Sequence, residues 1–108
     1  MKKEIVVKVQ VEGIHHWPEC PIEEVEFLRW RHRHMFSITL WKEVHHNDRE
    51  IEIIQLGRRV KEYLGTQPID FGRRSCEDIA EDLLGVFGAS AVEVLEDNEN
   101  GAKVYDRI

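Results

Sequence analysis

Two stretches in the first half of the chain alternate apolar and polar residues, one over residues 4–16 and one over about 30–44. Successive side chains of a β-strand point to opposite faces of its sheet, so both stretches predict half-buried strands. The apolar face of the second strand includes histidines near its start. The residues on the two faces are Ile5, Val7, Val9 and Val11, and Trp30, His32, His34, Phe36, Ile38 and Leu40.

The pattern changes between these strands and after them. Pro18 and Pro21 interrupt the first strand, and the acidic residues 22–27 are typical of a connection. From about 49 to 64, apolar residues recur at helical spacing, and Gly65 is suited to end that helix. We therefore expect a first helix after the second strand.

A second helix and two further strands are predicted in the last third of the chain. Ser75 followed by Asp78 resembles a capping box, so a helix is expected to begin there and to end at Gly88. Residues 91–96 and 102–107 alternate again, which predicts two more strands.

The element order is therefore β-β-α-α-β-β, with residues 65–74 as a loop. It predicts one α+β domain over residues 1–108, built as a four-stranded antiparallel sheet with both helices on one face. The turn between the last two strands is expected over residues 97–101, where the pair Asn100-Gly101 favours a tight hairpin.

Composition and charge narrow the classes of function. The chain has 108 residues and a net charge of −6, which argues against nucleic acid or anionic lipid as the main partner. No apolar run approaches the roughly 20 residues of a membrane helix, and the start lacks a secretory leader, so a cytoplasmic location is expected. Two cysteines, Cys20 and Cys76, are too few for a disulfide framework.

The six histidines form close sets along the sequence, and one set is suggestive of a metal site. His32 and His34 stand two residues apart and share a strand face, while the apolar face of the first strand continues through Gly13 to His15. In a paired hairpin, three imidazoles would converge at one end of that face. Three neutral imidazoles with an open fourth position make a catalytic-type zinc site. The alternative is that the histidines only form polar strand ends.

Several motifs in order along the chain resemble a known family. They are the strand end Gly13-Ile14-His15, the strand start His32-Arg33-His34, the helix starts Glu52-Ile53-Ile54-Gln55-Leu56 and Ser75-Cys76-Glu77-Asp78-Ile79-Ala80, and Glu96-Asp97 with Ala102 six residues after Glu96. The sequence resembles the 6-pyruvoyltetrahydropterin synthase / 6-carboxytetrahydropterin synthase group. These are zinc-dependent tunnelling-fold (T-fold) proteins with the same element order.

The resemblance implies a zinc ion, a pterin-type ligand and a homo-oligomer with sites between subunits. The residues implied are His15, His32 and His34 for the metal, and Glu96, Ser75 and Glu77 for the ligand. Two catalytic parts of the family are missing: its reactive cysteine corresponds to Leu28, and loop 65–74 has Asp70 but no histidine. A proton shuttle would have to be Cys20, Asp70 or a carboxylate in residues 23–26.

Some of these residues also have plainer interpretations. Glu96 can be a solvated turn carboxylate, and Cys20 can be a small buried residue instead of a group near the metal. The N-terminal field of the second helix could lower the pKa of Cys76, to which we assign no chemistry. Arg29, Arg31 and Arg33 suit phosphate or nucleic-acid binding, but pairing with the acidic residues 23–26 is the preferred interpretation. His45 and His46 are expected to be solvated.

Three functional hypotheses follow. The first is a zinc-binding synthase-like protein that acts on or binds a pterin or a deazaguanine precursor of the kind used in queuosine biosynthesis. The second is a noncatalytic protein that sequesters a purine- or pterin-like ligand in the same pocket, which the missing catalytic groups favour. The third is a structural subunit whose histidines have no chemical role.

Overall fold

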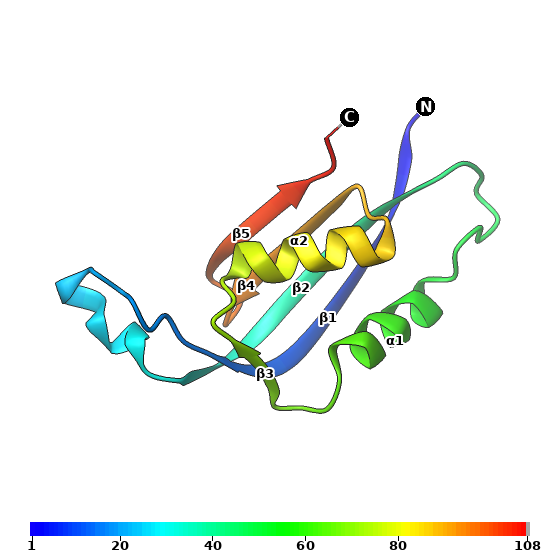
Figure 1. Ribbon diagram of the computed structural model, residues 1–108. Helices are drawn as coiled ribbons and strands as arrows, with labels where there is room; N and C mark the ends of the chain where they lie inside the picture. The colour runs from blue at the N-terminus through cyan, green and yellow to red at the C-terminus, as the bar shows by residue number, and fades with distance from the viewer. Residues whose placement is uncertain (108) are drawn as a thin grey trace.

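The computed structural model describes residues 1–107 and contains one five-stranded sheet, two α-helices and a 3-10 segment (Figure 1). The expected α+β class is confirmed. The elements in chain order are β1 (Lys3–His15), η1 (Glu23–Arg29), β2 (His32–Val44), α1 (Ile53–Leu64), β3 (Ile69–Gly72), α2 (Cys76–Phe87), β4 (Ala91–Glu96) and β5 (Asn100–Tyr105). None of the helices in residues 1–107 is long and apolar enough to cross a membrane.

The sheet has five strands in the order β3-β1-β2-β4-β5, so the four-stranded antiparallel sheet expected from the sequence is wrong. Part of the expected loop forms β3, which runs parallel to β1 with Ile69 beside Gly13. Ile69 and Phe71 point into the core, while Asp70 between them is exposed. A strand of 4 residues has too few alternating positions to be recognised from its pattern.

The long hairpin of β1 and β2 has the register that the histidine pattern required. Val9 lies opposite Ile38, Val11 opposite Phe36, and His15 opposite His32. A shift of one residue would turn every side chain of a strand to the other face, so the paired apolar faces fix this register. The hairpin therefore carries its histidines to one end of the core face.

Both helices pack on the same face of the sheet, as expected (Figure 1). α1 begins at Ile53, later than predicted, and the Glu52 carboxylate accepts hydrogen bonds from the backbone N–H groups of its first turn. The capping box of Ser75 and Asp78 at the start of α2 is confirmed, and Gly88 ends this helix with a φ of 58°. Val11, Phe36, Ile38, Leu56, Val60, Ile79, Leu83 and Val94 are among the core residues.

The turn between β4 and β5 lies within the expected residues 97–101, but it is centred on Asp97 and Asn98 and not on Asn100-Gly101. Both turn residues have positive φ angles, 53° and 59°, which asparagine and aspartate tolerate better than most side chains. Gly101 is already paired with Leu95 in the sheet, where a Cβ would come within 1.8 Å of the Val94 carbonyl oxygen. The glycine therefore serves a close backbone approach, and the turn places Asp97 next to the histidine end of β2.

The connection between β1 and β2 projects from the body of the molecule and contains η1 (Figure 1). Cys20 is buried within it, with its Sγ atom 3.7 Å from the Val25 carbonyl oxygen. The nearby arginines do not pair with the acidic residues 23–26 in the part of the chain that the structure describes. The Arg31 side chain pairs with Asp70, and the Arg33 side chain pairs with Glu12. The Arg29 side chain donates to the Cys20 carbonyl oxygen.

Candidate metal centre

The three predicted metal ligands lie together at one end of the β1–β2 hairpin. His15 ends β1, while His32 and His34 begin β2 on the same face. Their ring centroids are 4.7 to 5.5 Å apart, and one nitrogen of each ring lies within 4.8 Å of the other two. The strand register predicted from sequence thus brings the three imidazoles within reach of one metal ion.

Each imidazole is held by an acceptor at its Nδ1 atom. The partners are the Arg74 carbonyl oxygen at 3.0 Å for His15, the Trp30 carbonyl oxygen at 2.8 Å for His32, and the Asp97 carboxylate at 2.7 Å for His34. Carbonyl and carboxylate oxygens only accept, so each neutral ring carries its proton on Nδ1 and a lone pair on Nε2. This fixed tautomer is the arrangement of metal-binding histidines and their supporting partners.

The Nε2 atoms of all three rings are buried, and none makes a hydrogen bond of standard geometry in residues 1–107. Nε2 of His15 and of His34 faces only the Glu96 carboxylate, and Nε2 of His32 has no polar partner in the described residues. Buried polar atoms in proteins are nearly always satisfied, so this group of nitrogens requires an explanation. A metal ion is the group that three converging lone pairs bind. The arrangement therefore fits a metal better than it fits three polar strand ends.

Two of the imidazoles pack against the buried aromatic side chain of Phe36, which in turn packs against Phe71. The rings of His15 and His34 contact Phe36 edge-on, with centroids 5.2 and 5.8 Å away, and Phe36 contacts Phe71 in the same way. A Cβ at Gly13 would lie 2.5 Å from the Phe71 ring and 2.9 Å from the Phe36 ring. The missing side chain at this position lets the two rings fill the space under the site.

Glu96, at the end of β4, touches two of the imidazoles. Its Oε2 atom is 2.9 Å from Nε2 of His15, and its Oε1 atom is 3.4 Å from Nε2 of His34. The contact with His15 holds the pKa of Glu96 below its usual value. Burial lowers the pKa of His15, but contacts with Glu96 and the Arg74 carbonyl more than offset this, so its pKa is raised overall. Burial and the neighbouring imidazoles lower the pKa of His32.

Cys76 lies in the site, which the sequence analysis did not anticipate. Its Sγ atom is 3.7 Å from Oε2 of Glu96. Burial and the Glu96 charge raise the pKa of the thiol to about 12, so the idea that the helix field lowers this pKa is wrong. The thiol therefore stays protonated at neutral pH and can donate to the carboxylate.

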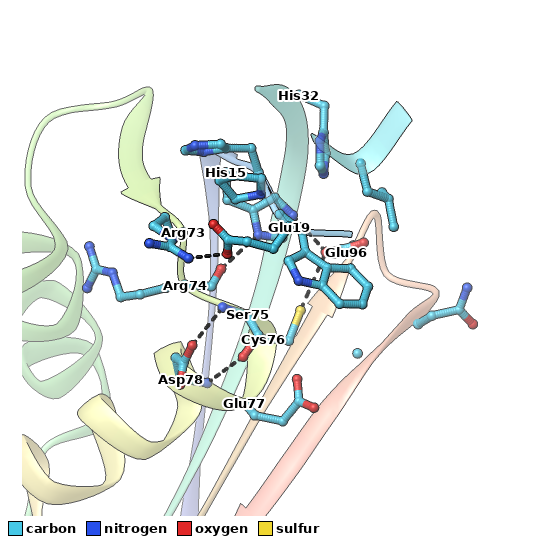
Figure 2. A pocket seen from close by; sticks show the side chains of 16 residues that line it. His15, Glu19, His32, Arg73, Arg74, Ser75, Cys76, Glu77, Asp78 and Glu96 are labelled. Atoms are coloured by element: carbon cyan, nitrogen blue, oxygen red, sulfur yellow. Dashed lines mark hydrogen bonds and ion pairs between the residues drawn. The ribbon is translucent and has the colours of Figure 1, made fainter. Parts of the chain in front are cut away.

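A cavity of about 650 Å³ opens beside the histidines, between the start of α2 and the projecting connection (Figure 2). The expected ligand-binding residues Glu96, Ser75 and Glu77 all line it. The Ser75 hydroxyl accepts a hydrogen bond from the Asp78 backbone N–H, so its oxygen is partly committed to the helix cap. Glu77 is exposed at the rim.

The candidate proton shuttles lie elsewhere, and this includes the carboxylates of residues 23–26. Neither Cys20 nor Asp70 lines the cavity; the Asp70 carboxylate accepts from the Gly72 backbone N–H and pairs with Arg31. Leu28, at the position of the family cysteine, does line it. His16 contacts the Gly72 carbonyl oxygen and is outside the three-histidine group.

The supporting partners of the histidines were missed by sequence reasoning. Two of them are backbone carbonyls, which no side-chain pattern reveals, and the third, Asp97, resembled an ordinary turn residue. The neighbouring Glu96-Asp97 pair at a strand end was the available signal.

No family model matches the sequence, and the comparison with curated proteins finds no match. The resemblance to the T-fold synthases therefore rests on the sequence motifs alone.

Proposed function

We propose that the chain is a zinc protein in which His15, His32 and His34 hold the metal and the adjoining cavity holds a small pterin- or purine-like molecule. The observation that carries this proposal is the set of three converging Nε2 atoms, each fixed by an acceptor on the opposite ring nitrogen. Imidazole nitrogens suit zinc, and three protein ligands leave room for a further one. When bound, zinc supplies Lewis-acid chemistry toward a hydroxyl or carbonyl of the ligand.

The cavity supports a small-molecule ligand. Its volume of about 650 Å³ lies within the range of roughly 300–1,000 Å³ that is usual for such sites. Carboxylates from Glu96 and Glu77 stand on its walls, and they are acceptors for the N–H edge of a pterin or guanine ring. In this proposal Glu96 anchors the ring, helped by Glu77 and Ser75 from the start of α2.

Ligand binding without catalysis is the second candidate, and the proton-transfer groups favour it. The thiol in the cavity is Cys76, whose raised pKa of about 12 keeps it from acting as a base at neutral pH. Cys20 and Asp70 lie away from the cavity, and Leu28 has no proton to exchange. We therefore expect synthase-type lyase activity to be weak or absent while ligand binding persists.

We further propose a homo-oligomer with its sites between subunits. β5 lies at one edge of the sheet. At the other edge β3 covers only Gly13–His15, so the side of β1 that faces away from β2 has no strand partner along most of its length in residues 1–107. Long uncovered edges pair readily with other strands. On the sheet face away from the helices, Val6 and Met35 are exposed. Light scattering that gives a mass near 12.8 kDa at micromolar concentration contradicts this proposal.

Calorimetry of the chain with a pterin and with guanine, in the presence and absence of zinc, tests the proposed function. We expect binding that requires zinc and weakens in Glu96→Ala, with an effect of about 1.5–3 kcal/mol for a lost charged partner. Product analysis with dihydroneopterin triphosphate separates an enzyme from a binding protein. Rapid zinc-dependent turnover contradicts the noncatalytic candidate, and failure of both rings to bind contradicts the proposed ligand class.

A further inference from the structure

The contact between Glu96 and His15 requires a proton or a metal ion between its two atoms. The Arg74 carbonyl fixes the proton of the neutral His15 ring on Nδ1, so Nε2 presents a lone pair to the carboxylate. Oε2 of Glu96, another lone-pair donor, is only 2.9 Å away. Two lone-pair donors face each other at this separation when a proton or a metal ion lies between them. The same carboxylate reaches Nε2 of His34 with its other oxygen, at 3.4 Å.

These separations match those between two ligands of one metal ion. In a tetrahedral zinc site with bonds of about 2.0–2.1 Å, neighbouring ligand atoms lie roughly 3.3 Å apart. The two Glu96 contacts, at 2.9 and 3.4 Å, bracket this value. Carboxylate oxygens are ordinary zinc ligands beside imidazole. The Glu96 carboxylate therefore lies at ligand-to-ligand distance from two of the three imidazoles, with a different oxygen toward each.

The backbone and a neighbouring thiol hold Glu96 in this position. Glu96 pairs in the sheet with Phe36, which is two residues beyond His34. Asp97, which follows Glu96, donates its backbone N–H to the Met35 carbonyl oxygen at 2.8 Å. On the side away from the imidazoles, the Cys76 thiol lies 3.7 Å from Oε2 (Figure 2). Ligating carboxylates commonly have such a hydrogen-bond donor behind them.

We propose that Glu96 is the fourth protein ligand of the metal in the chain without a small molecule, and that the small molecule binds by displacing this carboxylate. The inference rests on the proposed metal centre and deepens it. The resting site is then closed, with three imidazoles and one carboxylate. A displaced Glu96 stays in the cavity, where it can accept N–H bonds from the incoming ring. The ligand class is consequently a ring that carries both an N–H edge and an oxygen or nitrogen donor for the metal.

The other carboxylates of the cavity do not share this geometry. Glu19 pairs with Arg73, and Glu77 makes no ion pair with an imidazole within residues 1–107. Glu77 is therefore the matched control, because it lines the same cavity and carries the same charge.

Cobalt(II) substitution provides the test, because its visible spectrum reports the ligand set of the metal. Wild type, Glu96→Gln, Glu96→Ala and Glu77→Gln are loaded with cobalt and titrated with azide. We expect the spectra of wild type and Glu77→Gln to be insensitive to azide. Both Glu96 variants should show an azide-dependent change, together with a metal affinity lower by at least about 10–100-fold. Circular dichroism checks that each variant is folded.

The outcomes separate this inference from the proposed function. Azide-sensitive wild type, or Glu96 variants that keep the wild-type spectrum and affinity, would overturn the fourth-ligand role while leaving the three-histidine centre in place. A wild-type chain that binds neither cobalt nor zinc would overturn the metal centre itself. A change in Glu77→Gln equal to that in the Glu96 variants would show that the charge of the cavity, and not ligation by Glu96, governs the metal.

Discussion

Histidines stand at both ends of β2, and the two groups differ in every property that matters for binding a metal. At the start of β2, His32 and His34 lie against His15, each with an acceptor at Nδ1 and a buried Nε2. Just beyond its end, His45 and His46 are exposed, as expected, and their backbone N–H groups donate to the Glu50 carboxylate.

The contrast shows what a cluster of imidazoles needs in order to become a site. Residues two apart on a strand, such as His32 and His34, share a face, whereas His45 and His46 are adjacent and lie in a bend beyond the end of β2. Burial then removes water as a competing partner, and fixed Nδ1 acceptors direct the Nε2 lone pairs inward. The predictions below test this difference by changing one end of the hairpin and using the rest of the fold as the control.

Adding one methyl group under the histidines should have the largest effect. In Gly13→Ala the new Cβ would meet the Phe71 and Phe36 rings at less than 3 Å, so we expect a loss of about 1–3 kcal/mol in unfolding free energy and weaker zinc binding. Gly85→Ala is the control, because nothing lies within 4 Å of a Cβ there. Because Gly85 lies within α2, Gly85→Ala should raise the unfolding free energy by about 0.5–1 kcal/mol. Chemical denaturation measures the unfolding free energy of both variants, and equal effects would contradict the tight packing of Phe36 and Phe71 against Gly13.

Removing the carboxylate behind His34 should have the next largest effect. Asp97 accepts from Nδ1 of His34, and such supporting partners typically contribute 10–100-fold to metal affinity. We therefore expect Asp97→Ala to lower zinc affinity by about that factor. Glu50→Ala removes the corresponding acid at the other end and should leave the affinity unchanged. Competition with a chromophoric chelator measures the two affinities, and an unchanged value in Asp97→Ala contradicts the supporting role.

Loss of the N-terminal cap of α2 should lower the stability of the fold without changing zinc binding. The Ser75 hydroxyl accepts from the Asp78 N–H, and removing such a cap costs about 0.5–2 kcal/mol. Ser75→Ala should lower the unfolding free energy by this amount and leave zinc content unaltered. A loss of zinc in this variant would indicate that the helix start and the histidines are coupled.

The smallest effect is expected from pH at the solvated end. Hydrogen bonds from the backbone N–H groups of His45 and His46 hold the pKa of Glu50 below its ordinary value of 4.5. Because the folded pKa is the lower one, the stabilisation is full above about pH 4.5 and disappears as pH falls through the folded pKa. Glu50→Gln should therefore be slightly less stable than wild type at pH 7 and indistinguishable in stronger acid. A difference in unfolding free energy between Glu50→Gln and wild type that grows on acidification would contradict the predicted direction.

The sequence predicted the part of the site that depends on strand alternation. His15, His32 and His34 follow from period-2 positions on two strands that pair as a hairpin, so their convergence needed only the correct register. β3 was not predictable because its pattern is too short. The last turn was expected over the right residues, but its centre was misplaced because Gly101 was interpreted as a turn residue instead of a close-contact residue. The acceptors from Arg74 and Trp30 are backbone atoms, which depend on the folded chain and not on side-chain type.

The zinc content of the untagged chain and of two variants, after dialysis against trace-metal buffer, is the most direct test. We predict one zinc per chain in wild type and in His45→Ala, and none in His34→Ala. Zinc retained by His34→Ala, or lost equally from His45→Ala, would contradict the account that the two histidine groups of the hairpin differ in kind.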